Sequence, residues 1–442
     1  MTLSALRRAR LIALGAAAAI AAATIALIVL ADTGGGRSAS PASVVGEDLH
    51  RSTIYHSPQH PGYTAWVGAW VMPDGSLMTA FDQATGPVDP RRRALMPAAT
   101  LRRDFGLTET RRGSTPSTYQ DPRYDFWGLA QQVIYLRSTD DGRSWSVWRR
   151  DPFRALSPQA YSAQADTALP DGTLIRRVSG VDLANDPSIP HTALLQTLSF
   201  DPTDSTGQAA AWSAPRVVLH DPRVCTYQFS RIRQLSDGRV IALGAVVGYA
   251  HGHSGPCAPE ADGFSYLLMV APSASAAEQG RWSLGMPFTG QVAPNEWDVA
   301  QLRDGNLLAL MRTAVDGRPV RRQAILQARG GGWVMQRPRP LPDLPAFTPS
   351  GHPDLLATDE GAIVSFSDTG TAYTTDGGTT WHTLRFGSMP HLSYASRYYP
   401  YAIQGPDGRI EVFSSDGYDI PYGAFDESIV MDSFRLQVQA ER

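Results

Sequence analysis

The chain has 442 residues, 43% of them hydrophobic and 18% charged, with a formal net charge of −3, so it can bury a large core. No basic run is interleaved with aromatic residues, which argues against nucleic-acid binding. Zinc and P-loop patterns are also missing from the sequence, and no cofactor is expected.

The first 31 residues have the pattern of an export signal. Arg7, Arg8 and Arg10 precede an uncharged run, residues 11–31, that is long enough to cross a bilayer. The arginines would keep the N-terminus in the cytoplasm, and Val29-Leu30-Ala31 also fits a signal-peptidase site. Residues 1–31 are therefore predicted to form a helix that is either a membrane anchor or a cleaved signal peptide. The protein is expected outside the cytoplasm, anchored or secreted.

Residues 32–46 are rich in Gly, Ser, Ala and Pro, which predicts a flexible linker. The folded domain is accordingly expected over residues 47–442. Without the three arginines of residues 1–31, the exported part carries 36 Arg and no Lys against 42 acidic residues, a net charge of −6.

An Asp-Gly pair, once Asp-Glu-Gly, recurs six times beside apolar residues. The copies are residues 73–77, 170–174, 236–240, 303–307, 359–363 and 406–410. Each predicts a hairpin turn in which both central residues have positive φ. Most spacings are about 50 to 70 residues, the size of a four-stranded propeller blade, and residues 83–129 look like an insertion in the first repeat. Six repeats predict one all-β, six-bladed β-propeller, although length alone would suggest several domains.

Two segments share the pattern S/T-x-D-x-G-x-S/T-W, residues 138–145 and 374–381. The Asp and hydroxyl side chains can accept hydrogen bonds from turn amides, Gly supplies a positive φ, and Trp packs beneath the turn. We interpret both segments as structural turns of a propeller.

Cys225 and Cys257 flank the strands around the third Asp-Gly turn. In an oxidising compartment a disulfide between them is the favoured interpretation. Between the two cysteines, His251-Gly252-His253 could bind a metal, but such a pair is more typical of a polar loop, so no metal is expected.

Positions at one distance from each turn should form a ring, because the inner strands of a propeller converge at the end opposite these turns. Eight residues before each turn Asp stand Trp66, Ala163, Phe229, Glu296, Gly351 and Tyr399. Eight residues after it stand Asp82, Ser179, Ala245, Arg312, Ser367 and Ser415. The repeat therefore predicts that Glu296, Tyr399, Arg312 and Asp82 surround one site.

A Tyr–Glu pair is a neutral nucleophile with a built-in base, because the carboxylate can take the proton of a phenol whose pKa is about 10. Such a nucleophile suits an anomeric carbon that bears a carboxylate, and sialidases are the glycosidases with a Tyr nucleophile. A nearby Arg can hold a sugar carboxylate.

Several segments, spread over about residues 60 to 435, resemble the sialidase superfamily. The two S/T-x-D-x-G-x-S/T-W segments resemble its Asp-box. Residues 295–312 look like the blade with the Glu partner and one Arg of a substrate-binding triad, and Tyr399-Pro400-Tyr401 is similar to the segment with the Tyr nucleophile. Ser350-Gly351-His352-Pro353-Asp354 resembles the opening of the fifth blade.

The chain also departs from this pattern. The resemblance implies a triad Arg before the first turn, where the chain has Tyr63-Thr64-Ala65-Trp66, and another before the last Asp-box, where residues 368–373 contain none. Arg397 or Arg231 could substitute. The acid catalyst is expected in a loop before the first Asp-box, with Asp125 preferred and Asp82 as the alternative. Trp66 could stack on a sugar.

The leading hypothesis is therefore an exported sialidase-like exo-glycosidase that acts on extracellular glycans with retention. Tyr399 would be the nucleophile, Glu296 its base, Asp125 or Asp82 the acid, and Arg312 the ligand of an anionic group. The alternatives are a carbohydrate-binding propeller without catalysis, a related glycosidase for another sugar, and a cell-surface scaffold that binds protein. No oligomeric state is indicated.

Overall fold

The computed structural model describes residues 43–58, 62–85, 130–152, 166–177, 192–222, 224, 226–247, 264–288, 296–315, 318–349, 352–387, 389–416 and 428–439. Val44–Gln439 form one compact unit. The predicted signal or anchor helix, the candidate acid Asp125, both cysteines and the His251-Gly252-His253 segment lie outside the described residues. Within these ranges no helix is long and apolar enough to cross a membrane.

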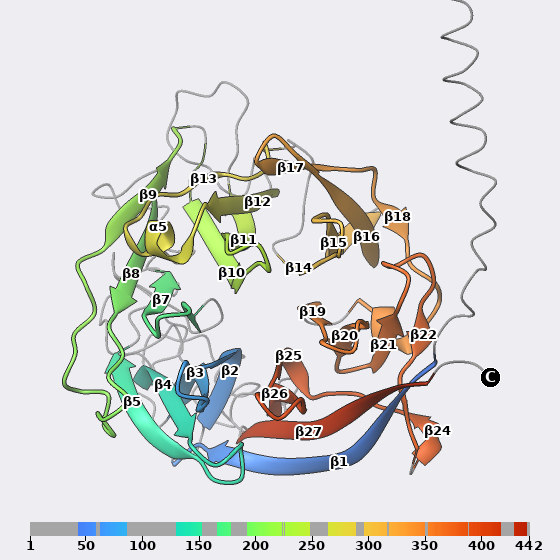
Figure 1. Cartoon of the computed structure of the whole chain (residues 1–442), viewed down its shortest axis with the longest axis horizontal. Helices are drawn as coiled ribbons and strands as arrows, with labels where there is room; N and C mark the ends of the chain where they lie inside the picture. Colours follow the sequence, from blue (N-terminus) through green and yellow to red (C-terminus); the bar gives the residue numbers. More distant parts are fainter. Residues whose placement is uncertain are drawn as a thin grey trace, which may run out of the picture. The chain divides into compact units, whose positions relative to one another are not determined.

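Six sheets surround a common axis, as the repeat predicts, and their strand pairs are antiparallel except for the parallel pair β1–β23 (Figure 1). From the axis outward, blade 1 contains β2 (Gly62–Val71), β3 (Leu77–Thr85), β4 (Ala130–Ser138) and β5 (Ser146–Pro152). Blade 2 contains β6 (Thr167–Ala168), β7 (Leu174–Arg177), β8 (Thr192–Leu198) and β9 (Arg216–His220). Blade 3 contains β10 (Thr226–Gln234), β11 (Val240–Val247), β12 (Phe264–Ala271) and β13 (Ser283–Leu284). The short helix α5 (Ala274–Glu278) lies between β12 and β13.

Blades 4 and 5 repeat this order. Blade 4 contains β14 (Trp297–Gln301), β15 (Leu307–Val315), β16 (Arg318–Arg329) and β17 (Gly332–Met335), with β18 (Arg339–Pro340) also paired to β16. Blade 5 contains β19 (Asp354–Ala357), β20 (Ile363–Ser367), β21 (Gly370–Thr374) and β22 (His382–Thr383). The 3₁₀ turn η4 (Pro345–Phe347) connects the two blades.

Blade 6 is built from both ends of the described chain. Its strands run outward as β25 (Tyr398–Gln404), β26 (Ile410–Asp416), β27 (Ser428–Gln439) and β1 (Ser43–His56), followed by β23 (Arg385–Phe386) and β24 (Met389–Ser393). Because β1 precedes blade 1 in sequence and pairs with β27, hydrogen bonds between these two strands close the ring (Figure 1).

The predicted linker extends too far, because β1 already begins at Ser43 rather than after residue 46. Val44 is buried in the core of blades 5 and 6, and Gly46 pairs with Phe386. A Cβ at Gly46 would lie 2.5 Å from the Phe386 ring. This glycine permits close packing, whereas the sequence interpretation took it as a sign of flexibility.

All six Asp-Gly turns connect an inner strand to its neighbour, but their predicted geometry was wrong in one respect. Only the glycines have positive φ, from +80° at Gly408 to +88° at Gly172. In the first turn Gly75 N–H donates to the carbonyl of Met72 at 2.9 Å, and Asp74 Oδ1 accepts from Ser76 N–H at 3.0 Å. This is a type I turn followed by a left-handed Gly, so the Asp keeps a negative φ.

The two S/T-x-D-x-G-x-S/T-W segments form equivalent turns between the third and outer strands of blades 1 and 5. In the first, Ser138 Oγ accepts from Gly142 N–H at 2.9 Å, and Asp140 accepts from both N–H and Oγ of Ser144. The second makes the same contacts through its own residues. Trp145 packs edge-on against Phe413 at 5.5 Å, so this turn locks blade 1 onto blade 6.

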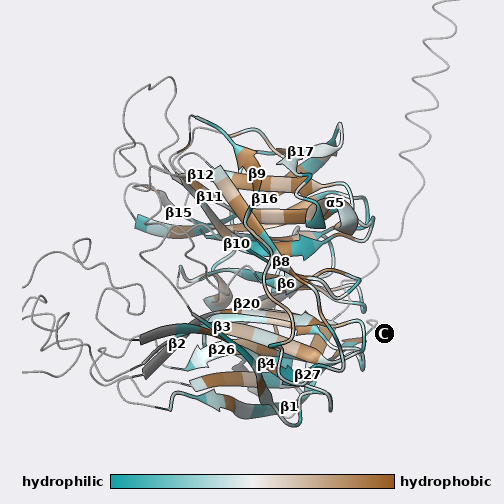
Figure 2. Cartoon of the chain, turned by 90° about the vertical axis from the view of Figure 1, so that its left-hand side faces the viewer, coloured by the Kyte–Doolittle hydropathy of each residue, from teal (hydrophilic) through white to brown (hydrophobic). Residues whose placement is uncertain are grey.

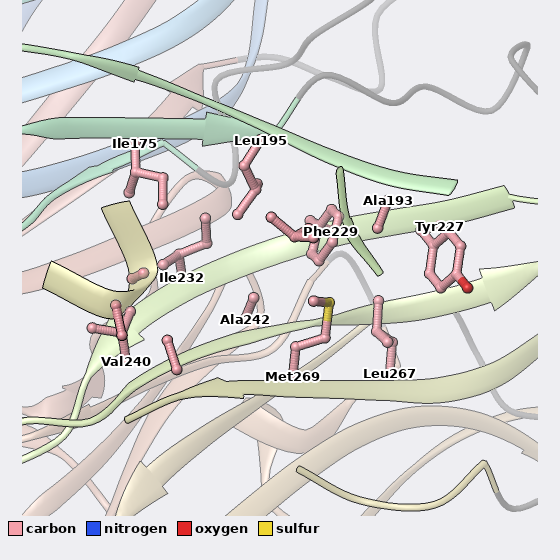
Figure 3. Packing of buried hydrophobic residues seen from close by; sticks show 14 of the residues in the cluster. Ile175, Ala193, Leu195, Tyr227, Phe229, Ile232, Val240, Ala242, Leu267 and Met269 are labelled. Carbon is pink, nitrogen blue, oxygen red and sulfur yellow. The ribbon is translucent and has the colours of Figure 1, made fainter. Parts of the chain in front are cut away.

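The hydrophobic core lies between neighbouring blades. Figure 3 shows Ile175 and Leu195 of blade 2 facing Phe229, Ile232 and other side chains of blade 3. Figure 2 shows hydrophobic residues along the strands and hydrophilic residues in the connecting turns. Each fully buried Leu, Ile or Phe contributes about 1.5 to 3 kcal/mol. This packing holds the inner strands in register around the axis.

Candidate active site

Tyr399, Glu296 and Arg312 meet at one place, as the ring of equivalent positions predicts, and we call them the Tyr399 cluster. The Tyr399 hydroxyl donates a hydrogen bond to Glu296 Oε1. Arg312 Nη1 donates to the other carboxylate oxygen, Glu296 Oε2, at 2.5 Å. Glu296 is buried, whereas 37% of the Arg312 side chain is exposed. Hydrogen bonds thus hold both carboxylate oxygens of Glu296 in place.

Two blades contribute to this cluster. Glu296 directly precedes β14, and Arg312 lies on β15 of the same blade, where its N–H also bonds to the Glu296 carbonyl at 3.1 Å. Tyr399 comes from β25 of blade 6, 103 residues away in sequence. The contact therefore depends on the closed ring and not on local structure.

A β-bulge presents the Tyr399 side chain. The register of β25 against β26 shifts between Tyr398 and Tyr401, and Tyr399 has φ +51°. A bulky residue in this left-handed region costs on the order of 1 to 3 kcal/mol, and such strain concentrates at functional sites. The bulge re-aims the side chain out of the strand's regular alternation.

Tyr399 is held in its protonated form. Burial raises its pKa well above that of a free phenol, and the charge of Glu296 raises it further. Tyr398, whose ring centroid is 4.3 Å away, and Arg312 act weakly in the opposite direction. Tyr399 is thus a neutral hydrogen-bond donor at physiological pH, and it can become a nucleophile only as its proton passes to Glu296.

Trp66 occupies the same position in blade 1 as Tyr399 does in blade 6. Both stand nine residues before the turn glycine, Gly75 or Gly408. Trp66 has φ +54°, and β2 and β3 shift register between Ala65 and Gly68. Its side chain is half-buried. The two strands thus use the same device to present an aromatic ring.

Asp82 is buried on β3, the second strand of blade 1. Its charge acts on Asp166 and Arg177, and Asp166 accepts a hydrogen bond from Tyr135 at 2.7 Å. Burial raises the pKa of Asp166 well above that of a free carboxyl group. Asp82 is thus part of a buried charged group with Asp166 and Arg177.

The two arginines predicted as substitutes have other partners. Arg231 is buried at the axis, where it pairs with Asp354 at 3.5 Å and lies 4.3 Å above the Tyr401 ring. Arg397 is exposed and pairs with Asp416 at 3.2 Å. Arg231 thus takes part in a network of inner-strand charges, while Arg397 lies at the surface.

That network joins four inner strands. Arg233 of β10 pairs with Asp298 of β14 at 2.5 Å. Asp298 in turn accepts the N–H of Leu355 on β19 at 2.9 Å, and Asp354 accepts the N–H of Ala402 on β25 at 2.9 Å. The network fixes β14 relative to β25, the two strands beside Glu296 and Tyr399.

Sequence reasoning missed two residues beside the cluster. Arg321 is opposite Arg312 on β16, is buried, and interacts with the charges of Glu296 and Asp368. Burial lowers its pKa to about 10, so it remains a cation at neutral pH. Arg321 could have been found from the pairing of β15 with β16, because this long hairpin places residues 312 and 321 side by side.

His352 is the second missed residue. It is buried, and its ring centroid is 6.3 Å from that of Tyr399. Its Nδ1 donates to the carbonyl of Pro353 at 2.6 Å, and burial lowers its pKa well below the usual range, so the ring is neutral. The fifth turn is Asp-Glu-Gly, so counting from its Asp selected Gly351. Counting nine residues back from Gly361 selects His352.

The other ring positions contribute packing or lie outside the described ranges. Phe229 is a core residue between blades 2 and 3 (Figure 3). Ala245, Ser367 and Ser415 are buried on their second strands. Ala163, Ser179 and Gly351 are outside the described part of the chain. Among the described residues no group of three His, Cys, Asp or Glu side chains could hold a metal ion.

No family model and no curated protein matches the chain. Solved structures do. A Dyadobacter fermentans protein of unknown function aligns with TM-score 0.55 at 15% identity, over 88% of this chain and 99% of that one. The fold that they share with this chain is the six-bladed β-propeller. The Hadza microbial sialidase Hz136 (TM-score 0.51, 14% identity, 85% of this chain and 66% of that one) and an α-L-arabinanase from Penicillium chrysogenum (0.50, 13%, 88% and 98%) share it.

Proposed function

We propose that the protein is a retaining glycosidase whose nucleophile is Tyr399 and whose general base is Glu296. The observation that carries this proposal is the hydrogen bond from the Tyr399 hydroxyl to Glu296 Oε1, formed across two blades beside Arg312. A strained bulge and a buried carboxylate are costly to maintain, and a catalytic pair accounts for both. Propellers host many functions, so the proposal rests on this cluster and not on the fold.

In the first step, Tyr399 Oη forms a bond to the anomeric carbon while its proton moves to Glu296 Oε1. The bond from the anomeric carbon to the leaving oxygen breaks, and an acid protonates that oxygen. Arg312 holds Glu296 Oε2, so Oε1 faces the phenol as the charge moves. The product is a glycosyl–Tyr399 intermediate.

In the second step, water attacks the anomeric carbon from the face that the leaving group vacated, and the bond from that carbon to Tyr399 Oη breaks. The former acid now takes the water proton, and Glu296 returns its proton to Tyr399 Oη. Two inversions give net retention. We assign the acid to Asp125 in the 83–129 insertion, because Asp82, the other candidate, is grouped with Asp166 and Arg177.

We further propose that the enzyme is exported and acts on extracellular glycans, with residues 1–31 as anchor or signal. The sugar is less constrained than the mechanism. The structures that share the fold include a sialidase and an arabinanase complexed with arabinobiose, so both a carboxylated and a neutral sugar are candidates.

The proposal is tested by release of 4-methylumbelliferone from a panel of aryl glycosides by the full chain, with Tyr399→Phe alongside. Tyr394→Phe is the matched control, because Tyr394 also donates to a buried carboxylate, that of Asp432, at 2.6 Å in the same blade. Turnover lost in Tyr399→Phe and kept in Tyr394→Phe supports the proposal. Undiminished turnover in Tyr399→Phe rules the mechanism out, and silence across the panel favours a carbohydrate-binding propeller.

A further inference from the structure

Two aromatic residues are presented by matching bulges in neighbouring blades. Trp66 and Tyr399 have φ +54° and +51°, and each lies at a register shift of its inner strand. Few non-glycine residues adopt this conformation, and bulky side chains there are outliers. If Trp66 were only a core residue, a regular strand would bury it without this cost. The same strained conformation at both positions indicates that the Trp66 ring, like that of Tyr399, has a functional role.

The two bulges are neighbours around the ring. Blade 6 precedes blade 1 at the point of closure, and β2 and β25 are in contact. Beside the bulges, Ser415 Oγ donates to the carbonyl of Thr64, which ties the second strand of blade 6 to the inner strand of blade 1. Both aromatic residues precede their turns by the same distance, so both belong to the end of the axis opposite the Asp-Gly turns.

The cations near this end already face anions. Arg312 is bonded to Glu296, and Arg321 donates to the carbonyl of Thr348 at 3.2 Å while interacting with Asp368 and Glu296. Within the Tyr399 cluster and the network of inner-strand charges, four arginines stand against four carboxylates. The arginines are Arg231, Arg233, Arg312 and Arg321; the carboxylates are Glu296, Asp298, Asp354 and Asp368.

This balance disfavours a carboxylated sugar. A substrate carboxylate would have to share Arg312 with Glu296, which already takes its Nη1, and it would bring a fifth negative charge toward four cations. Displacing Glu296 would also release the base from the position that the Tyr399 hydrogen bond requires. A neutral sugar incurs neither penalty, and the C–H face of a sugar ring can pack on an indole without any charge.

We propose that Trp66 is the stacking platform of this site and that the substrate is a neutral glycan, one whose reacting sugar carries no carboxylate. The proposal rests on the proposed function in placing the reacting sugar at Tyr399. Trp66 would contact that sugar or the one joined to it, and the ring would contribute affinity and orientation rather than proton transfer.

The test measures binding, so that it does not depend on turnover. The full chain carrying Tyr399→Phe is applied to an array of neutral and carboxylated glycans, alone and combined with Trp66→Asn or Trp66→Phe. Asn tolerates positive φ, so Trp66→Asn removes the ring without straining the bulge, and Trp66→Phe keeps an aromatic face. Far-UV circular dichroism and melting temperature check the fold of each protein.

We expect binding to neutral glycans that Trp66→Asn weakens about tenfold or more and Trp66→Phe largely retains, since an apolar ring face is lost only in the former. Preference for carboxylated glycans, equal binding by the Trp66→Asn protein, or no glycan binding would each overturn the inference. None of these results decides the proposed function, which is tested separately by aryl-glycoside turnover. An enzyme that cleaves only sialosides in a Tyr399-dependent way would uphold that function and refute a neutral substrate.

Discussion

Glu296→Gln should disable the enzyme while leaving its fold intact. The carboxylate accepts from Tyr399 on Oε1 and from Arg312 on Oε2. A glutamine has the same shape, and it can still accept the phenol's hydrogen bond through its carbonyl oxygen. It then turns its NH₂ group toward the Arg312 guanidinium, a contact between two donors. The substitution thus removes the base and also disturbs the orientation of Arg312.

The size of the loss follows from the chemistry. A positioned general base typically contributes about 10²- to 10⁴-fold, or about 2.7 to 5.4 kcal/mol of transition-state free energy. The phenol of Tyr399 is far from ionising at neutral pH, because burial raises its pKa well above the normal value. Spontaneous ionisation of the Tyr399 phenol therefore cannot replace the base, and we expect a rate loss in the upper part of that range.

The assay is kcat/KM on the best aryl glycoside of the panel, for wild type, Glu296→Gln and Arg312→Met. Arg312→Met keeps the base but removes the partner that orients it, so its loss should be smaller. Activity of Glu296→Gln within threefold of wild type, with unchanged pH dependence, would refute the assignment of Glu296 as the base. A deeper loss in Arg312→Met than in Glu296→Gln would make the arginine the principal group.

Three further predictions concern the scaffold. Gly46→Ala should lower the unfolding free energy by about 1 to 3 kcal/mol in denaturant melts, because the added Cβ would lie 2.5 Å from Phe386 where β1 closes the ring; unchanged stability would contradict this closure. Trp297→Phe should cost a similar ~1 to 3 kcal/mol, since it leaves the Gly244 carbonyl without the indole donor that reaches it at 2.6 Å. Burial raises the pKa of Glu411 from 4.5 to about 7, so the folded protein favours the protonated carboxyl group. As pH rises from about 4.5 through 7, the unfolding free energy of the wild type should therefore fall by up to ~3 kcal/mol relative to that of Glu411→Gln. Parallel pH–stability curves for the two proteins would contradict the last prediction.

The repeat made the fold predictable. Each Asp-Gly turn lies between strands that pack on the neighbouring blade, so local turn chemistry and the long-range pattern agree. The turn geometry was less accessible, because Asp-Gly serves both a type I′ turn and a type I turn with a left-handed Gly. The start of the domain was misjudged at Gly46, since composition does not distinguish a flexible Gly from one pressed against Phe386.

The site was predictable where it follows the repeat. Glu296, Arg312 and Tyr399 share offsets from their turns, and the closed ring brings them together. Arg321 was missed because its place depends on the register of β16 against β15. His352 was missed because the extra residue in the fifth turn shifts the count by one. Arg231 was proposed for a ligand, but its partners, Asp354 and Tyr401, come from other blades, which no local pattern reveals.

The most direct test of Tyr399 as nucleophile is mass spectrometry of the full chain after reaction with a 2-deoxy-2-fluoro analogue of its best substrate. Such an analogue slows breakdown of a covalent intermediate. We expect one added glycosyl mass on the peptide that contains Tyr399, lost in Tyr399→Phe and formed more slowly in Glu296→Gln. An adduct on another residue, or turnover to the inverted anomer with no adduct, would contradict it.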